Sequence, residues 1–258
     1  MPKNRVPHII FLYWVIKIIS TTLGETGADM FSMTFNLGYA FTIAMFFSLL
    51  LVALLVKLSL KRYDPAAYWV TFTLTAIAGT AISDFIDRTL KFGYAMGSAF
   101  LIVLLIITLV IWYKKERSIK VEYITTSTAE IFYWTAFLIA NTLGTAAGDF
   151  VADNLGLGFI YGTVLISALL IFIALLHFFT KISKTLLFWL AFVLTRPFGA
   201  TFGDVLTKSV AKGGINFGTI GSSIVFCVIL FFTIAKETQL EKMRSPAEFT
   251  GPCPKGTG

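Results

Sequence analysis

Long apolar segments follow one another along this chain, and each is long enough to cross a lipid bilayer as a helix. Eight of them lie near residues 8–28, 34–57, 67–87, 92–113, 130–152, 157–179, 185–207 and 215–235. About 20 apolar residues span the hydrocarbon core, and a helix satisfies every backbone polar group within its own segment. The spacing therefore predicts an all-α membrane protein with eight transmembrane helices.

The composition excludes several classes of function. Of the 258 residues, 57% are hydrophobic and 14% are charged, whereas soluble domains carry about 25% charged residues. The two cysteines and two histidines provide neither a disulfide framework nor a His-rich metal site. Because no nucleophile stands beside a general base, we expect no enzyme, and nothing in the sequence calls for a cofactor.

The basic residues mark one side of the predicted helices. Most Lys and Arg residues fall at the N-terminus, in the loops after even-numbered segments, and near the C-terminus. Loops rich in Lys and Arg stay in the cytoplasm, so both termini are predicted to be cytoplasmic. This placement accounts for the net charge of +7 and argues against nucleic acid as a partner.

One motif occurs four times in the chain. In each copy an aromatic residue precedes Trp, Gly follows the Trp by ten residues, and Asp follows the Gly by five. The repeats lie at about 8–60, 64–115, 128–180 and 184–236, and their Asp residues are Asp29, Asp84, Asp149 and Asp204. They make up one predicted membrane domain, residues 1–242, followed by a disordered Pro- and Gly-rich tail, residues 243–258.

The repeats are related in two pairs. Copies one and three are 120 residues apart, as are copies two and four, and each pair shares short sequences. Every copy holds an even number of spans, so all copies have the same orientation. The chain is therefore predicted to form two four-helix halves related by a pseudo-twofold axis along the membrane normal.

The four Trp-to-Asp segments also carry a resemblance. Together with NLGYA at 36–40, FYWTAF at 132–137 and LTRPFGATFGD at 194–204, they resemble a family of bacterial membrane proteins. That family is built of four tandem two-span repeats and is catalogued as a repeat of unknown function. The resemblance covers about residues 8–236 and implies the repeat plan and a bacterial inner-membrane location, but no activity.

The motif places carboxylates inside the membrane. Fifteen residues separate Trp from Asp, which is about 22 Å along a helix, so a Trp at the inner interface puts the Asp in the outer third of the core. A charge there costs about 2.5–3.5 kcal/mol on insertion scales. Either the Asp residues hold the repeats together, or they line a cation or proton pathway. The motif Gly either lets helices approach closely or unwinds the helix locally.

The neighbours of the Asp residues differ between copies. Asp84 is followed four residues later by Arg88. Asp204 is followed in the same way by Lys208, so structural ion pairs are predicted in copies two and four.

In copy one Glu25 lies four residues before Asp29, and in copy three Asp153 lies four residues after Asp149, so these copies are expected to concentrate four carboxylates without an adjacent base. The predicted cation-binding residues are Glu25, Asp29, Asp149, Asp153, Asn141 and Thr145, with Asp29 and Asp149 as metal ligands. Oxygen ligands alone suit Mg, Mn, Ca or alkali ions better than Zn or Cu. Paired carboxylates can also share a proton and relay it.

Two basic residues lie inside the predicted helices. Lys17 is expected to extend its amine to the nearby interface. Arg196, just before a Pro that kinks the helix, is expected to pair with a carboxylate or with backbone carbonyls. Alternatively, Arg196 forms an anion site or a cationic gate.

The leading functional prediction is a transporter or exporter of a small cation, such as divalent Mn or Mg, with or without proton coupling. Three alternatives stay open: a passive cation channel, an anion or organic-solute carrier centred on Arg196, and a structural membrane protein. The expected partners are a cation or proton and the lipid bilayer, and the sequence does not indicate an oligomeric state.

Overall fold

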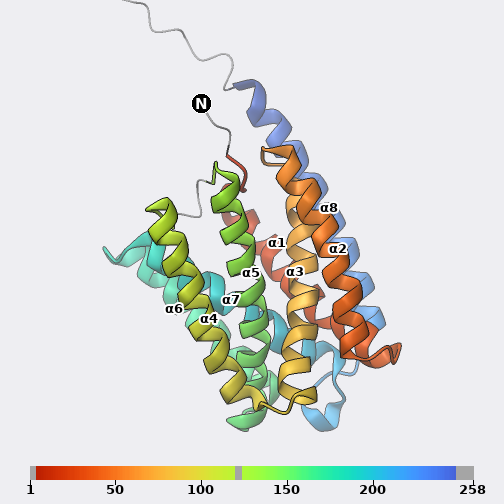
Figure 1. The fold of residues 1–258 in the computed structure, drawn as a ribbon. Coiled ribbons are helices and arrows are strands. Elements are labelled where there is room, and N and C mark those ends of the chain that lie inside the picture. The colour runs from red at the N-terminus through yellow and green to blue at the C-terminus, as the bar shows by residue number, and fades with distance from the viewer. Residues whose placement is uncertain (1–3, 120–123, 248–258) are drawn as a thin grey trace, which may run out of the picture.

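The structure, a computed structural model, describes residues 4–119 and 124–247 and is all-α, as predicted (Figure 1). Its α-helices are α1 (Phe11–Asp29), α2 (Tyr39–Leu60), α3 (Pro65–Asp84), α4 (Gly93–Glu116), α5 (Ser127–Asp149), α6 (Gly158–Phe179), α7 (Lys184–Thr207) and α8 (Thr219–Ala247). Helix α8 runs into the segment predicted to be a tail, and the rest of that segment lies outside the described residues.

Six of these helices are long and apolar enough to cross a membrane, namely α2, α3, α4, α6, α7 and α8. Helices α1 and α5 lie where the first and fifth segments were predicted, but they are more polar. Helix α1, for example, carries Lys17, Glu25 and Asp29 within 19 residues. By hydropathy the chain is therefore a multi-pass membrane protein with six candidate spans and two more polar helices.

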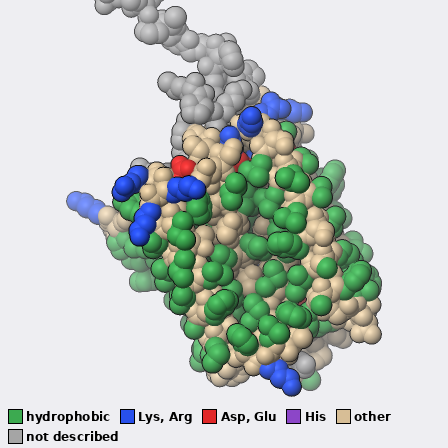
Figure 2. All heavy atoms as spheres, in the orientation of Figure 1, with side chains coloured by type: hydrophobic (Ala, Val, Ile, Leu, Met, Phe, Trp, Pro, Cys, Tyr) green, Lys and Arg blue, Asp and Glu red, His purple; other side chains and the backbone are tan. Residues whose placement is uncertain are grey.

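The odd-numbered helices form a closed inner bundle. Helix α1 packs on α3, α3 on α5, α5 on α7, and α7 packs back on α1. The even-numbered helices lie outside, and each packs on the inner helix of the following repeat, so that α8 returns to α1. In the most apolar 18-residue stretch of each helix, only 17% of the residues of α2 are buried, against 72% of those of α3. Because hydrophobic side chains cover the flank in Figure 2, the outer helices present the surface that suits lipid.

The motif glycines lie where neighbouring inner helices touch. A Cβ added to Gly24 would lie 2.6 Å from Ala76 Cβ, and one added to Gly79 would lie 3.0 Å from Asn141 Cβ. The corresponding contacts of the other two repeats are Gly144 on Arg196 and Gly199 on Thr21. All four glycines lie in regular α-helix. The motif glycine therefore allows close approach of the helices, and the alternative prediction, that it unwinds the helix locally, was wrong.

The helices become irregular only after the Asp. Short π-helical segments follow it in three repeats, namely η1 (Met30–Thr34), η2 (Phe85–Thr89) and η3 (Phe150–Asn154). In the fourth repeat α7 continues to Thr207 and a 3-10 turn, η4 (Val210–Lys212), follows. Segments of this kind often lie at functional sites.

The bundle has two chemically different ends. Both ends of the described chain lie at one of them (Figure 1), which we name the aromatic end because the motif Trp residues begin the inner helices there. Lys and Arg side chains mostly gather near this end on the face shown in Figure 2. The opposite end, where the motif Asp residues lie, is named the acidic end.

Gly24→Ala is expected to lower the melting temperature of the purified protein, because the new Cβ overlaps Ala76 of α3. Overpacking costs about 1–3 kcal/mol, which exceeds the gain of roughly 0.5–1 kcal/mol from replacing a helical glycine. The matched control is Gly27→Ala, whose Cβ would lie 3.6 Å from Ile77 Cδ1 in ordinary contact. Thermal unfolding in detergent measures both variants, and a Gly24→Ala protein as stable as the control would contradict the close-approach role.

Candidate functional site

One face of each inner helix meets the others along the axis of the inner bundle. In every repeat the residues 3, 7, 11 and 15 positions after the motif Trp are buried. A spacing of four residues keeps them on one side of the helix. The four repeats therefore contribute one side chain each to successive layers, and the last of these is the acidic layer, Asp29, Asp84, Asp149 and Asp204.

A lysine lies between the Asp residues of repeats four and one. Lys208 Nζ is 3.1 Å from Asp204 Oδ1 and 2.7 Å from Asp29 Oδ2. Lys208 thus keeps its contact within repeat four and also joins α7 to α1. Its ammonium stands between two carboxylates and partly neutralises both of them.

An arginine joins the Asp residues of repeats two and three in the same way. Arg88 Nε lies 2.9 Å from Asp84 Oδ1, and Arg88 Nη2 lies 3.0 Å from Asp149 Oδ2. The expectation that Asp29 and Asp149 lack a basic partner was therefore wrong. The closed inner bundle brings the base of the preceding repeat beside each of them, a contact that spacing within one repeat does not reveal.

Glu25 lies one layer closer to the aromatic end than Asp29. Its Oε2 accepts hydrogen bonds from the hydroxyls of Thr80 at 3.3 Å and Thr145 at 3.4 Å. The same oxygen is 3.4 Å from Arg196 Nη1. A single carboxylate on α1 therefore contacts side chains of all three other inner helices.

Arg196 fills the adjoining part of the axis and is 1% exposed. Besides Glu25, its guanidinium donates to the backbone carbonyls of Thr21 at 3.1 Å and Ala76 at 3.3 Å, and to the hydroxyl of Thr80. The structure therefore shows the pairing with a carboxylate and backbone carbonyls. An anion at Arg196 would have to replace acceptors that already surround it.

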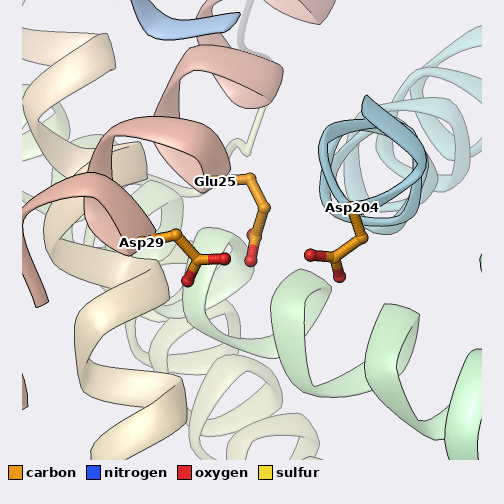
Figure 3. A group of neighbouring side chains, drawn as sticks. All are labelled: Glu25, Asp29 and Asp204. Atoms are coloured by element: carbon orange, nitrogen blue, oxygen red, sulfur yellow. The ribbon is translucent and has the colours of Figure 1, made fainter. Parts of the chain in front are cut away.

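Three carboxylates face one common space (Figure 3). One oxygen from each of Glu25, Asp29 and Asp204 lies within 4.8 Å of the others, and the side chains converge from α1 and α7. All three residues are 1–3% exposed. Oxygens that ligate one Ca²⁺ at about 2.3–2.6 Å lie at most about 5 Å apart, whereas those on the smaller Mg²⁺ lie at most about 4.2 Å apart. The three carboxylates are therefore close enough for an ion of the size of Ca²⁺ and would have to draw together slightly around a smaller one. Asp204, and not the predicted Asp149, completes the group with Glu25 and Asp29. Asp149 is instead paired with Arg88 of repeat two.

The side chains joined by these ion pairs do not balance in charge. Among them three bases face five carboxylates, and full ionisation would leave an excess of two negative charges. Asp87, a further buried carboxylate, lies outside these pairs. The bases are Arg88, Arg196 and Lys208, and the carboxylates are Glu25, Asp29, Asp84, Asp149 and Asp204. Uncompensated buried charge is costly, so two protons or one divalent cation would complete the balance.

The other predicted ligands lie apart from the three carboxylates. Asp153 is exposed, and its carboxylate accepts a hydrogen bond from the Tyr94 hydroxyl at 3.4 Å. The Asn141 amide donates to the Thr75 hydroxyl at 2.9 Å, in the layer that contains Arg196. Of the additional ligands predicted from the sequence, the structure thus brings Thr145 alone into contact with Glu25.

Aromatic side chains close the axis on the other side of Arg196. Three of the four side chains in that layer are Phe72, Phe137 and Phe192, whose ring centroids lie 4.1–6.4 Å apart. The fourth is Lys17, which is 0% exposed and donates to the Phe192 carbonyl at 2.6 Å and to the Thr195 hydroxyl. The expected extension of Lys17 to the interface was wrong, because the surrounding inner helices enclose its amine.

The sequence interpretation missed Thr80 and Asp204 as neighbours of Glu25. The repeat alignment contains a signal for both. Thr80 occupies in repeat two the position that Glu25 occupies in repeat one, and Asp204 is the motif Asp of repeat four. Placing equivalent positions around a closed bundle would have brought them together.

Fold and site together define a multi-pass membrane protein whose tandem repeats enclose a charged cluster. A model of the family described as Repeat of Unknown Function (DUF347) matches the chain at residues 12–63, 67–118, 132–183 and 187–238. These matches cover most of the chain, which therefore belongs to this family, and they confirm the four tandem repeats. Comparison with curated proteins and with solved structures finds no match.

Lys208→Gln is expected to destabilise the protein, because Asp29 and Asp204 would face each other without a cation. Breaking a buried ion pair costs about 3–5 kcal/mol, and the 18% exposure of the Lys208 side chain places the expected loss near or below the lower limit. Adding Asp204→Asn should restore part of the stability, since it removes one of the two carboxylate charges that the loss of Lys208 leaves without a cation.

Lys91→Gln serves as the control, since Lys91 is an exposed base in the loop after η2. Thermal unfolding of the two single variants and the double variant provides the measurement. Losses that simply add in the double variant would show that Lys208 does not stabilise the protein by neutralising Asp204.

Proposed function

We propose that this chain is a membrane transporter or exporter of a small cation, with a divalent ion such as Mn²⁺ or Mg²⁺ as its substrate. The single observation that carries the proposal is the group of buried carboxylates formed by Glu25, Asp29 and Asp204. These oxygens suit hard divalent ions. The excess of buried negative charge gives the cation a favourable electrostatic environment.

In this function protons compete with the cation. Removing the cation leaves carboxylates that repel one another, and like charges at close range favour uptake of a proton by one of them. Two protons carry the charge of one divalent ion. Exchange of protons for the ion therefore keeps the buried cluster neutral in both states and couples the two movements.

We place α1 and α5 across the membrane beside the six apolar helices, with the aromatic end and both termini in the cytoplasm. The membrane is the bacterial inner membrane, as the family resemblance implies. The arrangement of Asp84, Arg88 and Asp149 recurs 120 residues away in the chain as Asp204, Lys208 and Asp29. This correspondence supports a pseudo-twofold axis along the membrane normal.

In this function the cation reaches the carboxylates from the acidic end. The side chains of Arg88 and Lys208 are 36% and 18% exposed, whereas the carboxylates that they contact are 2–3% exposed. The two bases therefore lie between these carboxylates and the surface of the acidic end. A cation arriving from the acidic end would bind among the three carboxylates, with Lys208 moved aside but kept within the cluster, so that its charges still balance.

The axis is closed on the side of the aromatic end. Arg196, Lys17 and the aromatic layer stand between the carboxylates and the aromatic end. Two buried bases repel a cation strongly at low dielectric, so passage requires that these side chains and their helices rearrange. This closure favours a carrier with alternating access over a permanently open channel. A channel, a solute carrier centred on Arg196 and a non-transporting structural protein remain the alternatives, and we propose no enzyme.

Flux into proteoliposomes tests the transport function. Vesicles loaded with a metal-sensitive dye and a pH dye are expected to show Mn²⁺ uptake with opposite proton movement for the wild type. Asp29→Asn and Asp204→Asn should abolish the uptake, because each removes a ligand from the group of three. The matched control is Asp153→Asn, whose carboxylate is exposed and outside the group.

Ligand-dependent stability provides a second, direct readout. Mn²⁺ at 100 times its Kd stabilises the folded state by about 2.7 kcal/mol, so it should raise the melting temperature of the wild type but not that of Asp29→Asn. A folded wild type that neither moves nor binds Mn²⁺ or Mg²⁺ would overturn the proposal in favour of a structural role. Unitary conductance steps in a planar bilayer would favour the channel.

A further inference from the structure

One position of the outer helices has the same place in all four repeats, near the aromatic end. It lies 19 residues after the glycine at the start of each outer helix. The residues there are Lys57, Trp112, His177 and Glu237, and the glycines are Gly38, Gly93, Gly158 and Gly218.

In three repeats this side chain contacts the inner helix of the repeat on the opposite side of the bundle, two repeats away. The contacts are Lys57 Nζ to Glu130 of α5 at 2.9 Å, Trp112 to Trp189 of α7 with ring centroids 6.3 Å apart, and Glu237 to Trp69 Nε1 of α3 at 2.5 Å. Each contact closes the space between an outer helix and the inner bundle. The closure uses an ion pair, an aromatic contact or a hydrogen bond, according to the repeat.

The equivalent contact of α6 with α1 is open. His177 is exposed, and between it and Trp14 lies a groove of about 510 Å³. The groove is bounded by α1, α6 and α7, and its lining includes Ile18, Leu170, Ala174 and Ala191. Trp14 is only partly buried. The equivalent residues Trp69, Trp134 and Trp189 are 0–8% exposed.

The groove has apolar walls and a basic rim. Its lining runs along α6 from Phe178 to Leu170, a length of about 12 Å at the helical rise, and consists mainly of Ile, Leu, Phe and Ala side chains. His177 and Lys184 line it near the aromatic end. Basic pockets between membrane helices bind anionic lipid headgroups, and an extended hydrocarbon chain suits the apolar walls.

We propose that this groove binds an anionic phospholipid. One acyl chain lies along α6 between α1 and α7, and the phosphate is held by Lys184 and His177. The lipid replaces the contact that the chain's own side chains make in the other three repeats. The deep end of the groove includes Thr195, which accepts a hydrogen bond from Lys17, so the lipid adjoins the closed part of the axis. The site is independent of the proposed cation transport.

Quenching of Trp14 fluorescence tests the site in nanodiscs that contain the full chain. The quencher is a phospholipid with brominated acyl chains, added as phosphatidylglycerol or as phosphatidylcholine at equal mole fraction. The Trp14 signal is the difference between the wild type and Trp14→Phe. Brominated phosphatidylglycerol is expected to quench this signal several-fold more strongly than brominated phosphatidylcholine.

Variants distinguish the headgroup contact from the acyl contact. Joint replacement His177→Gln and Lys184→Gln should reduce the preference for phosphatidylglycerol to about onefold, whereas Lys181→Gln, outside the groove lining, should preserve it. Filling the groove with Ala174→Phe should remove most of the quenching by either lipid. Ala168→Phe, at an exposed position of α6 outside the groove lining, is its matched control.

Two results would overturn the assignment. Equal quenching by both lipids, unchanged in Ala174→Phe, would mean that Trp14 meets only bulk lipid. Absence of quenching together with cross-linking of Ala174→Cys between two molecules would show that a second copy of the chain covers the groove.

Discussion

The close contact of each motif glycine with the next inner helix is the constraint on which the rest of the structure depends. A missing side chain at Gly24, Gly79, Gly144 and Gly199 lets four helices close into one bundle. Only in a closed bundle can one carboxylate, Glu25, contact residues of α3, α5 and α7. The enclosure also separates the charged side chains from lipid, where they would be far more costly.

The charged cluster combines neutralisation with an excess of carboxylates. Lys208 and Arg88 each lie between Asp residues of two successive repeats, so each base fastens two inner helices together. A tethered ammonium can leave and return, whereas a hydrophobic contact cannot be exchanged for an ion. These ion pairs therefore stabilise the closed bundle, and under the proposed function Lys208 would also have to leave Asp29 and Asp204 for an ion to bind.

The side chains that give this fold its distinctive chemical features lie at positions where the repeats differ from one another. Lys17 stands in a layer that is otherwise phenylalanine, and Glu25 stands in a layer that otherwise holds small or hydroxyl-bearing side chains. His177 leaves open the contact that Lys57 closes with Glu130. The shared residues build the scaffold, while single exceptions supply the charge, the closure of the axis and the lateral groove.

The sequence by itself determined the helices, the four repeats and the position of each Asp along its helix, because apolar length, motif spacing and helical rise are local properties. It also placed Arg88 within reach of Asp84, since both lie on one turn. Only the tertiary structure decided that Arg88 also reaches Asp149, and that Asp204 joins Glu25 and Asp29. Those contacts depend on the order in which helices close around the axis, and the spacing of residues within one helix carries no information about that order.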